Sequence, residues 1–473
     1  MQFDLVVIGS GPAGHKAALQ AAKAGKQVAM VVGDLGLGGG CVHTGTLPSK
    51  SLRESVYRYS LGSRGMLGQE IDSWEKPERK RAIPDYHRLL NRRNRVISVE
   101  MQVIQDQLTR NNVMIIPGMA SFVTETELEV NYQGTRRLIR GDKIIIAVGA
   151  RPIAPSHLKV DSKRVFDSDT IFKMEKVPKT MVVLGGGIIG CEYASMFSMA
   201  GTRVFLVDKR HEILASVDRE IVNHLMDRFH YHGMEIILET EVKKLKKQKA
   251  GVEVELSNGR SIKTDAVLVA LGRTGNIEKL QLKNAGIEPN QRGLIEVNEN
   301  YETSTPGIYA VGDVIGFPAL ASTSMEQGRL ACCHAFGICS TTSAQISELY
   351  PYGIYTIPEI SMIGPTEEQL TKDGVQFVSG RAHYREIARG QIVGDRWGLL
   401  KLLVDKKTLK VLGVHIIGDS AAEIIHIGQA VMAHGADVRY FIQNVFNYPT
   451  LAEAYKTAAF HAVNQIGNKT ETR

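Results

Sequence analysis

Cysteines are scarce in this sequence and long apolar segments are missing, and each absence excludes a class of protein. The chain has five cysteines in 473 residues, an odd and sparse set that fits neither a disulfide framework nor a spaced zinc site. No run of about 18 uncharged apolar residues is present, as a membrane span requires. The cysteines are Cys41, Cys191, Cys332, Cys333 and Cys339. We therefore expect neither a bound metal nor a membrane partner, and we place the last three cysteines in a helix core.

The first residues give no sign of secretion. The chain starts with MQFDLVV, which enters an apolar run without the basic flank of a secretory signal. We therefore expect a cytoplasmic protein.

Basic clusters contribute to a formal net charge of +7. They lie at residues 79–81, 92–95 and 243–247. Such clusters can bind nucleic acid or anionic surfaces. Nearby acidic residues such as Glu75 and Glu78 favour solvated helix faces and loops instead. We expect no nucleic-acid partner, and a basic balance also suits polyanionic dinucleotides.

The length and the 43% hydrophobic content predict several domains, and two stretches of the chain follow the same order of elements. Residues 3–8 form an apolar strand pattern that breaks at Gly9, and a helix over 12–24 and a strand over 27–32 follow. The same order returns with a strand over 180–184, a helix ending at Ala200 and a strand over 203–208. The sequence therefore predicts two βαβ dinucleotide folds, about 175 residues apart.

The rest of the chain predicts a connecting region and a third unit. Residues 68–84 are mostly polar and predict a surface loop, and 86–110 has the apolar spacing of a long helix. From about residue 347 the pattern changes to strands followed by helices. Strands are expected around 354–356, 399–404 and 411–416, and helices over 421–434 and 452–465. This order predicts a C-terminal α+β unit.

Each predicted dinucleotide fold carries a GxGxxG motif between its first strand and its helix. At that place bare backbone can approach a pyrophosphate held by the helix N-terminus. The glycines are Gly9, Gly11 and Gly14 in the first fold, and Gly185, Gly187 and Gly190 in the second. The two motifs predict two bound dinucleotides.

The residue that ends the second strand of such a fold selects the ribose. A carboxylate there bonds a free 2'-hydroxyl and repels a 2'-phosphate. In the second fold this residue is Asp208, which favours NAD, but Lys209 and Arg210 follow and offer two cations to a 2'-phosphate. We therefore expect tolerance of both NAD and NADP. The first fold has Val32 at this position, so either Asp34, two residues further on, binds the ribose or less specific contacts hold the adenosine.

Six segments follow one another in the order found in one family of flavoenzymes. They are GGGCVHTGTLPSK (38–50), IIIAVGARP (144–152), GGGIIGCEYA (185–194), GIYAVGDVIG (307–316), YTIPEISMIGPTEEQL (355–370) and FNYPTLAEAY (446–455). By these motifs the chain resembles the dihydrolipoamide dehydrogenase and glutathione reductase family over essentially its whole length. The resemblance implies one FAD per subunit in a homodimer or higher homo-oligomer, with a nicotinamide nucleotide as the reductant of the flavin.

The same resemblance divides the chain into three domains. Residues 1–152 and 273–346 are expected to form a discontinuous FAD-binding domain, residues 153–272 an NAD(P)-binding domain, and residues 347–473 a dimerisation domain. The predicted fold class is α/β, with two Rossmann-like dinucleotide-binding domains and a C-terminal α+β dimerisation domain.

Two parts of the family's disulfide machinery are missing together. The family carries a CxxxxC redox pair before the PSK lysine, whereas here Cys41 is followed by Thr46 at the second position. The C-terminal HPxxxE dyad of the family has become Tyr448 and Glu453, and a phenol with a reference pKa of about 10 is a poor general base at neutral pH. The paired loss suggests an electron acceptor other than a disulfide.

Further motifs narrow the resemblance to the flavoprotein transhydrogenases of this family. They are CxHxGTxPSK, GCEYAS, GRTGN (272–276), EIIHIGQA (423–430) and NYPTxAEAY. The resemblance implies hydride transfer from NADPH to FAD and then to NAD, in a ping-pong cycle through one nucleotide site. A diaphorase or quinone reductase of the same fold remains an alternative, as does a non-catalytic flavin or nucleotide sensor.

The resemblance also implies roles for single residues. Lys50 would stabilise the negative charge of the reduced flavin, Glu192 would pair with Lys50 beneath the nicotinamide, and Asp313 would bond the ribityl chain. The structural alternatives are an exposed lysine at a helix start, a first-turn carboxylate on a helix dipole, and strand-end packing. Three glycines complete the expected contacts: Gly40 and Gly149 for FAD, and Gly272 for the nicotinamide nucleotide.

Three residues of the expected catalytic set have open interpretations. Cys41 either lies against the flavin as a thiolate or fills space as a small buried side chain. Tyr448 either shields the partner subunit's flavin or packs the dimer interface. Together with Glu453 it is expected to approach that flavin.

Overall fold

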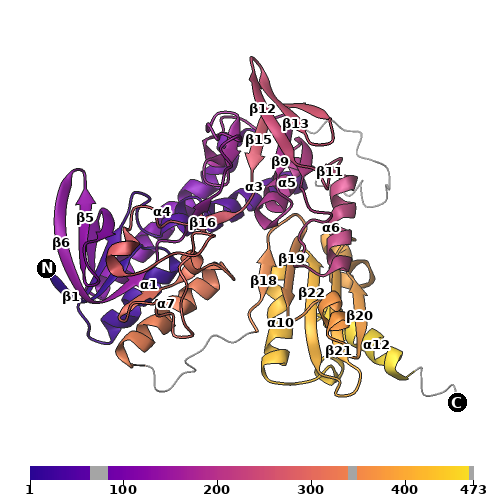
Figure 1. Ribbon diagram of the computed structural model, residues 1–473. Helices are drawn as coiled ribbons and strands as arrows, with labels where there is room; N and C mark the ends of the chain where they lie inside the picture. Colours follow the sequence, from indigo (N-terminus) through magenta and orange to yellow (C-terminus); the bar gives the residue numbers. More distant parts are fainter. Residues whose placement is uncertain (64–83, 339–348, 468–473) are drawn as a thin grey trace.

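The computed structural model describes residues 1–63, 84–338 and 349–467, which form three units, each around its own sheet (Figure 1). In Figure 1 the first unit lies at the left, the second at the top and the C-terminal unit at the right. The predictions for the basic cluster at 79–81, for Cys339 and for most of the loop at 68–84 lie outside the described residues. The mixed α/β fold class is confirmed.

The first sheet is built around the strand that opens the chain. Its order is β3 (Met114–Pro117), β2 (Val28–Val32), β1 (Gln2–Ile8), β6 (Thr135–Ile146), β5 (Glu127–Tyr132) and β4 (Met119–Phe122), with β17 (Ile308–Ala310) paired to β6. β1 runs parallel to β2 and β6. Leu5, Val6 and Val7 are completely buried, as expected for a parallel strand covered on both faces.

Helices cover this sheet and carry part of the candidate site. α1 (Pro12–Lys23) starts with proline after Gly11, a favourable first position for a residue without an N–H. It packs against α7 (Ala321–Phe336) at backbone distance, because a Cβ on Gly328 would lie 2.0 Å from the Ala13 carbonyl oxygen. The other helices of this unit are α2 (Gly39–His43), α3 (Thr46–Ser63) and α4 (Tyr86–Arg110).

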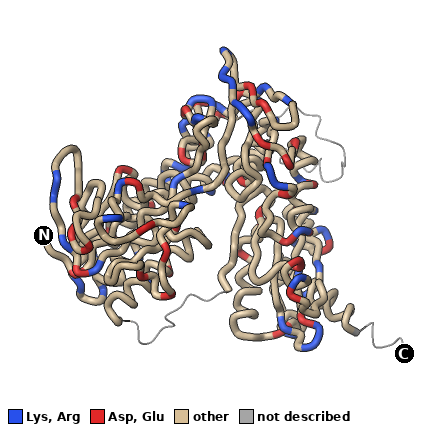
Figure 2. Tube along the Cα trace, in the orientation of Figure 1, with Lys and Arg blue, Asp and Glu red and all other residues tan. Residues whose placement is uncertain are grey.

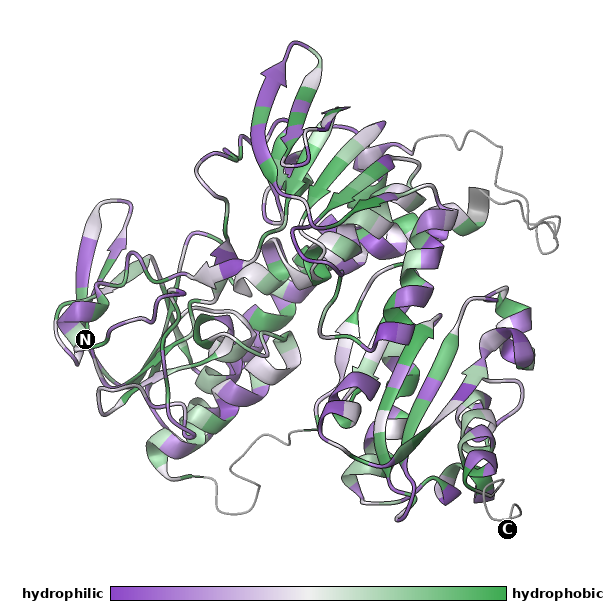
Figure 3. Cartoon of the chain, turned by 45° about the vertical axis from the view of Figure 1, so that its right-hand side comes forward, coloured by the Kyte–Doolittle hydropathy of each residue, from purple (hydrophilic) through white to green (hydrophobic). Residues whose placement is uncertain are grey.

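The second sheet repeats the parallel arrangement. Its order is β11 (Glu235–Ile237), β10 (Arg203–Val207), β9 (Thr180–Leu184), β15 (Ala266–Val269) and β8 (Val165–Asp167). α5 (Ile188–Met199) follows β9, and α6 (Arg219–Tyr231) follows β10. A smaller antiparallel sheet of β12 (Val242–Gln248), β13 (Gly251–Leu256) and β14 (Ser261–Thr264) packs beside it. The strands of the parallel sheet are largely apolar, whereas β12 in the smaller sheet is mostly hydrophilic (Figure 3).

Two of the basic clusters lie among the described residues, and both are mostly exposed. The lysines of 243–247 lie on β12, at the hairpin seen at the top of Figure 2. Lys246 pairs with Glu255, and Lys247 with Asp161. In the cluster at 92–95, Arg93 is partly buried and lies 4.6 Å from the centroid of the Phe172 ring. Ion pairs thus neutralise two of the lysines on β12, and Arg93 packs against an aromatic ring.

The C-terminal unit is an antiparallel sheet covered by helices. The strand order is β18 (Tyr352–Ile354), β19 (Glu359–Ile363), β22 (Val411–Gly418), β21 (Leu399–Asp405) and β20 (Phe377–His383). The helices are α8 (Glu367–Lys372), α9 (Ala388–Val393), α10 (Ala421–Ala433), α11 (Arg439–Gln443) and α12 (Glu453–Gly467). α12 lies directly on β20, because a Cβ on Gly380 would be 2.0 Å from the Ala458 carbonyl oxygen.

Two features join the second unit to its neighbours. β7 (Ala150–Pro152) and β16 (Arg273–Gly275) pair antiparallel where the chain leaves the first unit and returns to it. A buried ion cluster joins α6 to the C-terminal sheet. In it, Lys401 Nζ lies 2.9 Å from Asp218, 3.0 Å from Glu220 and 2.5 Å from Glu367. The Lys401 and Asp218 side chains are 1% and 0% exposed.

Most expected elements are confirmed within one or two residues, including both βαβ openings and the helix over 86–110. The strand expected around 354–356 is β18 at Tyr352–Ile354, because Thr356 and Ile357 instead lead into a turn before β19. Cys332 and Cys333 are buried on α7, as expected, and Cys333 is disulfide-bonded, which the sparse set of cysteines does not predict. No helix in the described ranges is long and apolar enough to cross a membrane. The three domain boundaries remain a prediction.

Candidate active site

A cavity of about 2020 Å³ connects the two dinucleotide folds and also touches the C-terminal unit. Most of the residues that the sequence singles out lie on its wall. From the first fold and the segments after it these are Gly9, Gly11, Asp34, Gly40, Cys41, Lys50, Gly149 and Asp313; from the second they are Gly185, Gly187, Glu192, Asp208, Lys209, Arg210 and Gly272. One continuous space therefore runs past both glycine motifs.

The first glycine motif forms a tight turn that opens onto the cavity. Gly9 has φ +109°, a conformation that favours glycine, and a Cβ on Gly14 would lie 2.0 Å from the Gly9 carbonyl oxygen. A Cβ on Gly11 would meet no atom within 4 Å. The first and third glycines thus allow the turn, and the second leaves open space at the N-terminus of α1, where a pyrophosphate fits.

The second motif reproduces this geometry. Gly185 has φ +108°, and a Cβ on Gly190 would lie 1.7 Å from the Gly185 carbonyl oxygen. Asp208 follows the last residue of β10 and pairs with Arg210, whose Nη2 lies 2.7 Å from Asp208 Oδ2. The residues at this end of the cavity are therefore already bonded to each other.

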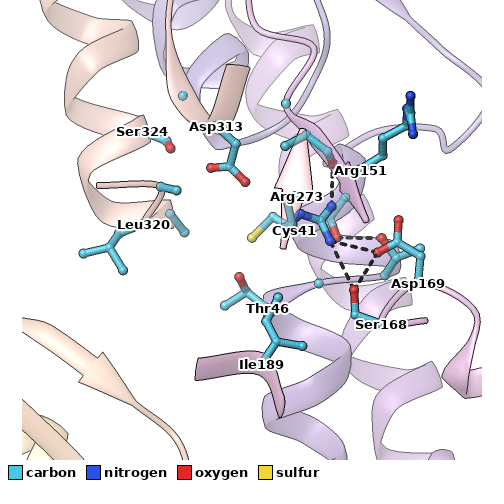
Figure 4. A pocket seen from close by; sticks show the side chains of 18 of the residues that line it. Cys41, Thr46, Arg151, Ser168, Asp169, Ile189, Arg273, Asp313, Leu320 and Ser324 are labelled. Atoms are coloured by element: carbon cyan, nitrogen blue, oxygen red, sulfur yellow. Dashed lines mark hydrogen bonds and ion pairs between the residues drawn. The ribbon is translucent and has the colours of Figure 1, made fainter. Parts of the chain in front are cut away.

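The part of the cavity nearest the first fold holds three polar groups close together. Figure 4 shows Cys41, Thr46 and Asp313 around the same space. Burial raises the pKa of Cys41, although a hydrogen bond with Thr46 acts in the opposite direction. Burial also raises the pKa of Asp313. Among the described residues no group hydrogen-bonds the Asp313 carboxylate, which leaves it available to a ligand hydroxyl.

Of the two interpretations of Cys41, the raised pKa favours the neutral thiol. A thiolate is stabilised by nearby positive charge or a helix N-terminus. The positive charge of Lys50 is outweighed here by burial and by the negative charges of Asp313 and Glu100. Cys41 is thus a partly buried thiol in the cavity wall.

Lys50 and Glu192 meet where the two folds join. Lys50, on α3, donates from Nζ to both carboxylate oxygens of Glu192 on α5, at 2.9 and 2.8 Å. The Glu192 side chain is 5% exposed and that of Lys50 27%. The Tyr355 backbone N–H donates to Glu192 Oε1 at 2.8 Å, and Lys50 Nζ lies 4.8 Å from the Tyr355 ring centroid. The pair is fixed in place and still reaches the cavity.

Tyr448 and Glu453 lie on the C-terminal unit, away from this cavity. Tyr448 is 74% exposed. Glu453 Oε2 is buried and has no hydrogen-bond partner within the described part of the chain. Their expected approach to the flavin of a partner subunit stays a prediction.

Two residues at the site were missed by sequence reasoning. Tyr355 bonds Glu192 across 163 positions of sequence, although its segment, YTIPEIS, stands among the family motifs. Arg273 donates from Nη1 to Ser168 Oγ and to Asp169 Oδ1, both at 3.2 Å (Figure 4). The sequence signal for Arg273 is its place in the GRTGN motif, next to Gly272.

Comparisons with known proteins identify the family of this chain. Residues 3–328 match the model of the pyridine nucleotide-disulphide oxidoreductases, and residues 350–459 match the dimerisation domain of the same family. The chain belongs to the pyridine nucleotide-disulphide oxidoreductase family.

Relatives with assigned names resemble the chain from end to end. A soluble pyridine nucleotide transhydrogenase of Mycobacterium bovis is 47% identical, with 98% of each chain covered. One from Pseudomonas savastanoi is 42% identical, covering 98% of this chain and 99% of the relative. Both relatives are named for transhydrogenation, the reaction that the motif resemblance implies.

Two solved structures agree with the fold of this chain. The HOCl-induced flavoprotein disulfide reductase RclA of Escherichia coli, solved as a Cu(II) complex, has a TM-score of 0.87 and 27% identity, over 97% of this chain and 99% of its own. LpdA from Mycobacterium tuberculosis has a TM-score of 0.86 at 24% identity, over 96% and 99%. The latter likeness concerns the fold alone.

Proposed function

We propose that the protein is a soluble pyridine nucleotide transhydrogenase, a flavoenzyme that transfers hydride from NADPH to FAD and then to NAD⁺. The observation that carries the proposal is the Lys50–Glu192 pair, which lies in a cavity shared by two dinucleotide motifs. Thr46 and Tyr448 stand where a redox thiol and an imidazole would serve a disulfide substrate. The relatives at 42–47% identity carry this activity in their names.

The residues of the first fold fit FAD. The open space at Gly11 suits the pyrophosphate, and the unbonded Asp313 carboxylate suits a ribityl hydroxyl. Asp34 lies exposed in the same cavity and is the candidate for the adenosine ribose, with Gly40 and Gly149 in the wall beside the cofactor. When bound, FAD accepts hydride from one nicotinamide and passes it to another.

Lys50 supplies positive charge where negative charge develops during the reaction. In a cavity shielded from water such a charge acts more strongly than at the surface. Glu192 holds the Lys50 ammonium through two hydrogen bonds, and the Tyr355 N–H holds Glu192. These hydrogen bonds hold the Lys50 ammonium in one position, which we place beneath the nicotinamide.

The second fold takes NAD(H) and NADP(H) in turn at one site, in a ping-pong cycle. Gly185, Gly187, Gly190 and Gly272 shape the turn and wall, and Asp208, Lys209 and Arg210 lie at the ribose end. Cys41 contributes a neutral thiol to the wall on the flavin side.

We further propose that the protein is a cytoplasmic homodimer or higher homo-oligomer without a nucleic-acid partner. The match of residues 350–459 to a dimerisation domain supports the assembly. In it, Tyr448 and Glu453 would approach the flavin of the partner subunit. The three largest sheets support the division into residues 1–152 with 273–346, 153–272 and 347–473.

The test is reduction of thionicotinamide-NAD⁺ by NADPH with the FAD-loaded protein, followed by its absorbance, which differs from that of NADPH. We expect rapid reduction of the analogue and weak reduction of quinones. Rapid quinone reduction with no analogue reduction would identify a quinone reductase instead. Failure to reduce either acceptor with FAD bound would identify a sensor.

A further inference from the structure

The acidic residue at the end of β10 is not free to meet a ligand. Asp208 Oδ1 accepts from Arg210 Nε at 2.9 Å, and Oδ2 accepts from Arg210 Nη2 at 2.7 Å. Oδ1 also accepts from the Arg210 backbone N–H at 2.8 Å, and Oδ2 from the Gly186 N–H at 2.5 Å. The Asp208 side chain is 5% exposed. The guanidinium of Arg210 therefore covers a carboxylate whose oxygens are already bonded.

The covering guanidinium itself faces the cavity. The Arg210 side chain is 43% exposed and lies on the cavity wall. Its Nη2 is 4.0 Å from the place of a Cβ on Gly187, the second glycine of the motif. Arg210 Nη1 makes no hydrogen bond to any described residue. A partly exposed guanidinium with a free nitrogen therefore lines the cavity beside the glycine motif, and a guanidinium suits a phosphate.

The backbone around this pair is fixed, so only side chains are free to rearrange. The Glu239 N–H donates to the Arg210 carbonyl at 3.0 Å, and the Thr240 N–H donates to the Asp208 carbonyl at 3.1 Å. The Leu214 N–H donates to the Gly186 carbonyl at 2.9 Å. A nucleotide that needs a different arrangement here must obtain it by rotating Arg210 and not by moving the loop.

The charges fit neither an NAD-only nor an NADP-only site. A site for NAD alone leaves the carboxylate open to the ribose hydroxyls, whereas here it is covered. A site for NADP alone has no use for a carboxylate, because a bare one repels the 2'-phosphate. Arg210 cancels the charge of Asp208, and Lys209, 72% exposed and 3.8 Å from Glu241, adds a second cation.

We propose that Arg210 switches between two positions, and that this switch lets one ribose site accept both nucleotides. In the covered position, seen in the structure, Arg210 neutralises Asp208 and donates with Lys209 to the 2'-phosphate of NADP(H). In the open position Arg210 rotates into the cavity, and Asp208 accepts a hydrogen bond from the free 2'-hydroxyl of NAD(H). The switch rests on the proposed transhydrogenation but concerns only the choice of nucleotide.

The open position leaves no buried charge without partners. Asp208 keeps its hydrogen bonds from the backbone N–H groups of Gly186 and Arg210, and the ribose hydroxyl replaces the guanidinium. Although burial opposes ionisation, the hydrogen bonds from Arg210 and Gly186 lower the pKa of Asp208. Arg210 moves from one partly exposed position to another, so its desolvation changes little.

The test is the affinity of the FAD-loaded protein for two fragments, adenosine 2',5'-bisphosphate and AMP, measured by calorimetry. We expect the wild-type protein to bind both with Kd values within about 10-fold. Arg210→Ala should weaken the bisphosphate at least about 100-fold, because a phosphate ligand is lost and a carboxylate is uncovered. AMP binding should stay the same or tighten. Asp208→Asn should weaken AMP about 10-fold and leave the bisphosphate at least as tight.

Arg260→Ala is the matched control. Arg260 lies in the same unit, pairs with Glu235 and has the same 43% side-chain exposure, but it does not line the cavity. It removes one positive charge from the second unit, so we expect both Kd values to change less than about 2-fold. The decisive variant is Asp208→Asn/Arg210→Ala. Compared with Asp208→Asn alone, its Kd for the bisphosphate should rise no more than about 10-fold.

Two results would overturn the switch. One is an equal loss of both fragments in Arg210→Ala, and the other is the same loss of bisphosphate affinity with and without the Asp208 carboxylate. If Asp208→Asn does not fold, Arg210→Lys is measured in its place. Because this variant keeps the positive charge, its Kd for the bisphosphate should stay within about 10-fold of the wild-type value. A loss of affinity as large as in Arg210→Ala would contradict the neutralisation of Asp208 by charge. Neither fragment carries a nicotinamide, so failure of hydride transfer would contradict the proposed function alone.

Discussion

The two dinucleotide folds share one backbone and differ where each meets an adenosine ribose. Gly9 and Gly185 have φ angles of +109° and +108°. At the end of the second strand, however, the first fold has Val32, apolar and 7% exposed, whereas the second has the paired Asp208. The glycine motif thus predicts that a dinucleotide binds, and the residues after the second strand determine which one.

The residue after the third glycine differs as well. It is His15 in the first fold, 7% exposed, with a buried Nε2 that has no hydrogen-bond partner among the described residues. In the second fold it is Cys191, completely buried, whose thiol donates to the Gly186 carbonyl at 3.5 Å. Because imidazole titrates near neutral pH and a buried thiol does not, the two folds should respond differently to acid.

The largest effect is expected from disrupting the buried ion cluster around Lys401, which joins α6 to the C-terminal sheet. Lys401→Met leaves Asp218 completely buried without its cation, which should lower the free energy of unfolding by about 3 to 5 kcal/mol. Chemical denaturation followed by tryptophan fluorescence measures this. Lys246→Met, which removes an exposed lysine paired with Glu255, should leave the midpoint almost unchanged. Equal shifts in both variants would contradict the structural weight given to the cluster.

The next largest effect is expected from replacing the third glycine of either motif with alanine. Each replacement should abolish ligand binding in its own fold and leave the other fold unaffected. A Cβ on Gly14 or Gly190 would overlap a backbone carbonyl oxygen, which only a shift of the turn can relieve. The cost is about 3 kcal/mol or more, equivalent to at least about 100-fold in affinity. Gly14→Ala should lose FAD, seen as loss of the yellow absorbance. Gly190→Ala should keep FAD and lose nucleotide binding, and each variant serves as the control of the other.

Acid should act on the first fold through His15. Burial lowers the pKa of His15 to about 4 from an ordinary value of 6.5, so the unfolded chain binds a proton more readily than the folded one. Stability is therefore full above about pH 6.5 and falls towards pH 4, by up to about 3 kcal/mol. Denaturation monitored by bound flavin, from neutral pH to about pH 4.5, measures the slope.

His15→Leu should flatten this slope, and His87→Gln, on the exposed surface of α4, should not. An unchanged slope in His15→Leu would show that other groups cause the acid response. Cys191→Ala should leave the slope unaltered too, because burial raises the pKa of that thiol far from this range.

The smallest effect is expected at the ribose of the first fold. Asp34 is an exposed carboxylate in the cavity, so Asp34→Asn should weaken FAD about 10-fold, as for one hydrogen bond to a charged group. FAD titration of the apoprotein, read by flavin fluorescence, gives the Kd. Glu125→Gln, exposed outside the cavity, is the control. Unchanged affinity in Asp34→Asn would mean that other groups hold the ribose hydroxyls.

Sequence reasoning succeeded where a pattern is local. β1, β9 and β10 were predicted because parallel strands buried on both faces read as unbroken apolar runs. The glycine motifs were found because each needs only its own six residues and the elements on either side. The pairing of Lys50 with Glu192 came from the family resemblance, and the hydrogen bonds between them agree with it.

Contacts between side chains of distant segments could not be predicted from the sequence. The Lys401 cluster gathers carboxylates from α6 and α8, which follow no common period. The Asp208–Arg210 bond is local, but a side-chain rotamer decides whether the arginine covers the carboxylate or reaches away from it. Tyr355 bonds Glu192 through its backbone N–H, which every residue except proline possesses, so the residue type gives no sign of this hydrogen bond. The Tyr355 ring makes a separate contact with Lys50, whose Nζ lies 4.8 Å from the ring centroid.

That backbone bond from Tyr355 to Glu192 limits how freely the units of such an enzyme can be recombined. The C-terminal unit supplies a donor to the Glu192 carboxylate of its own chain, besides any role in assembly. A chimera that takes its C-terminal unit from a relative must therefore keep the path of the chain at residue 355, whatever residue stands there. Proline is the one replacement that would remove the donor, so the chain path at this position has to be preserved more strictly than its side chain.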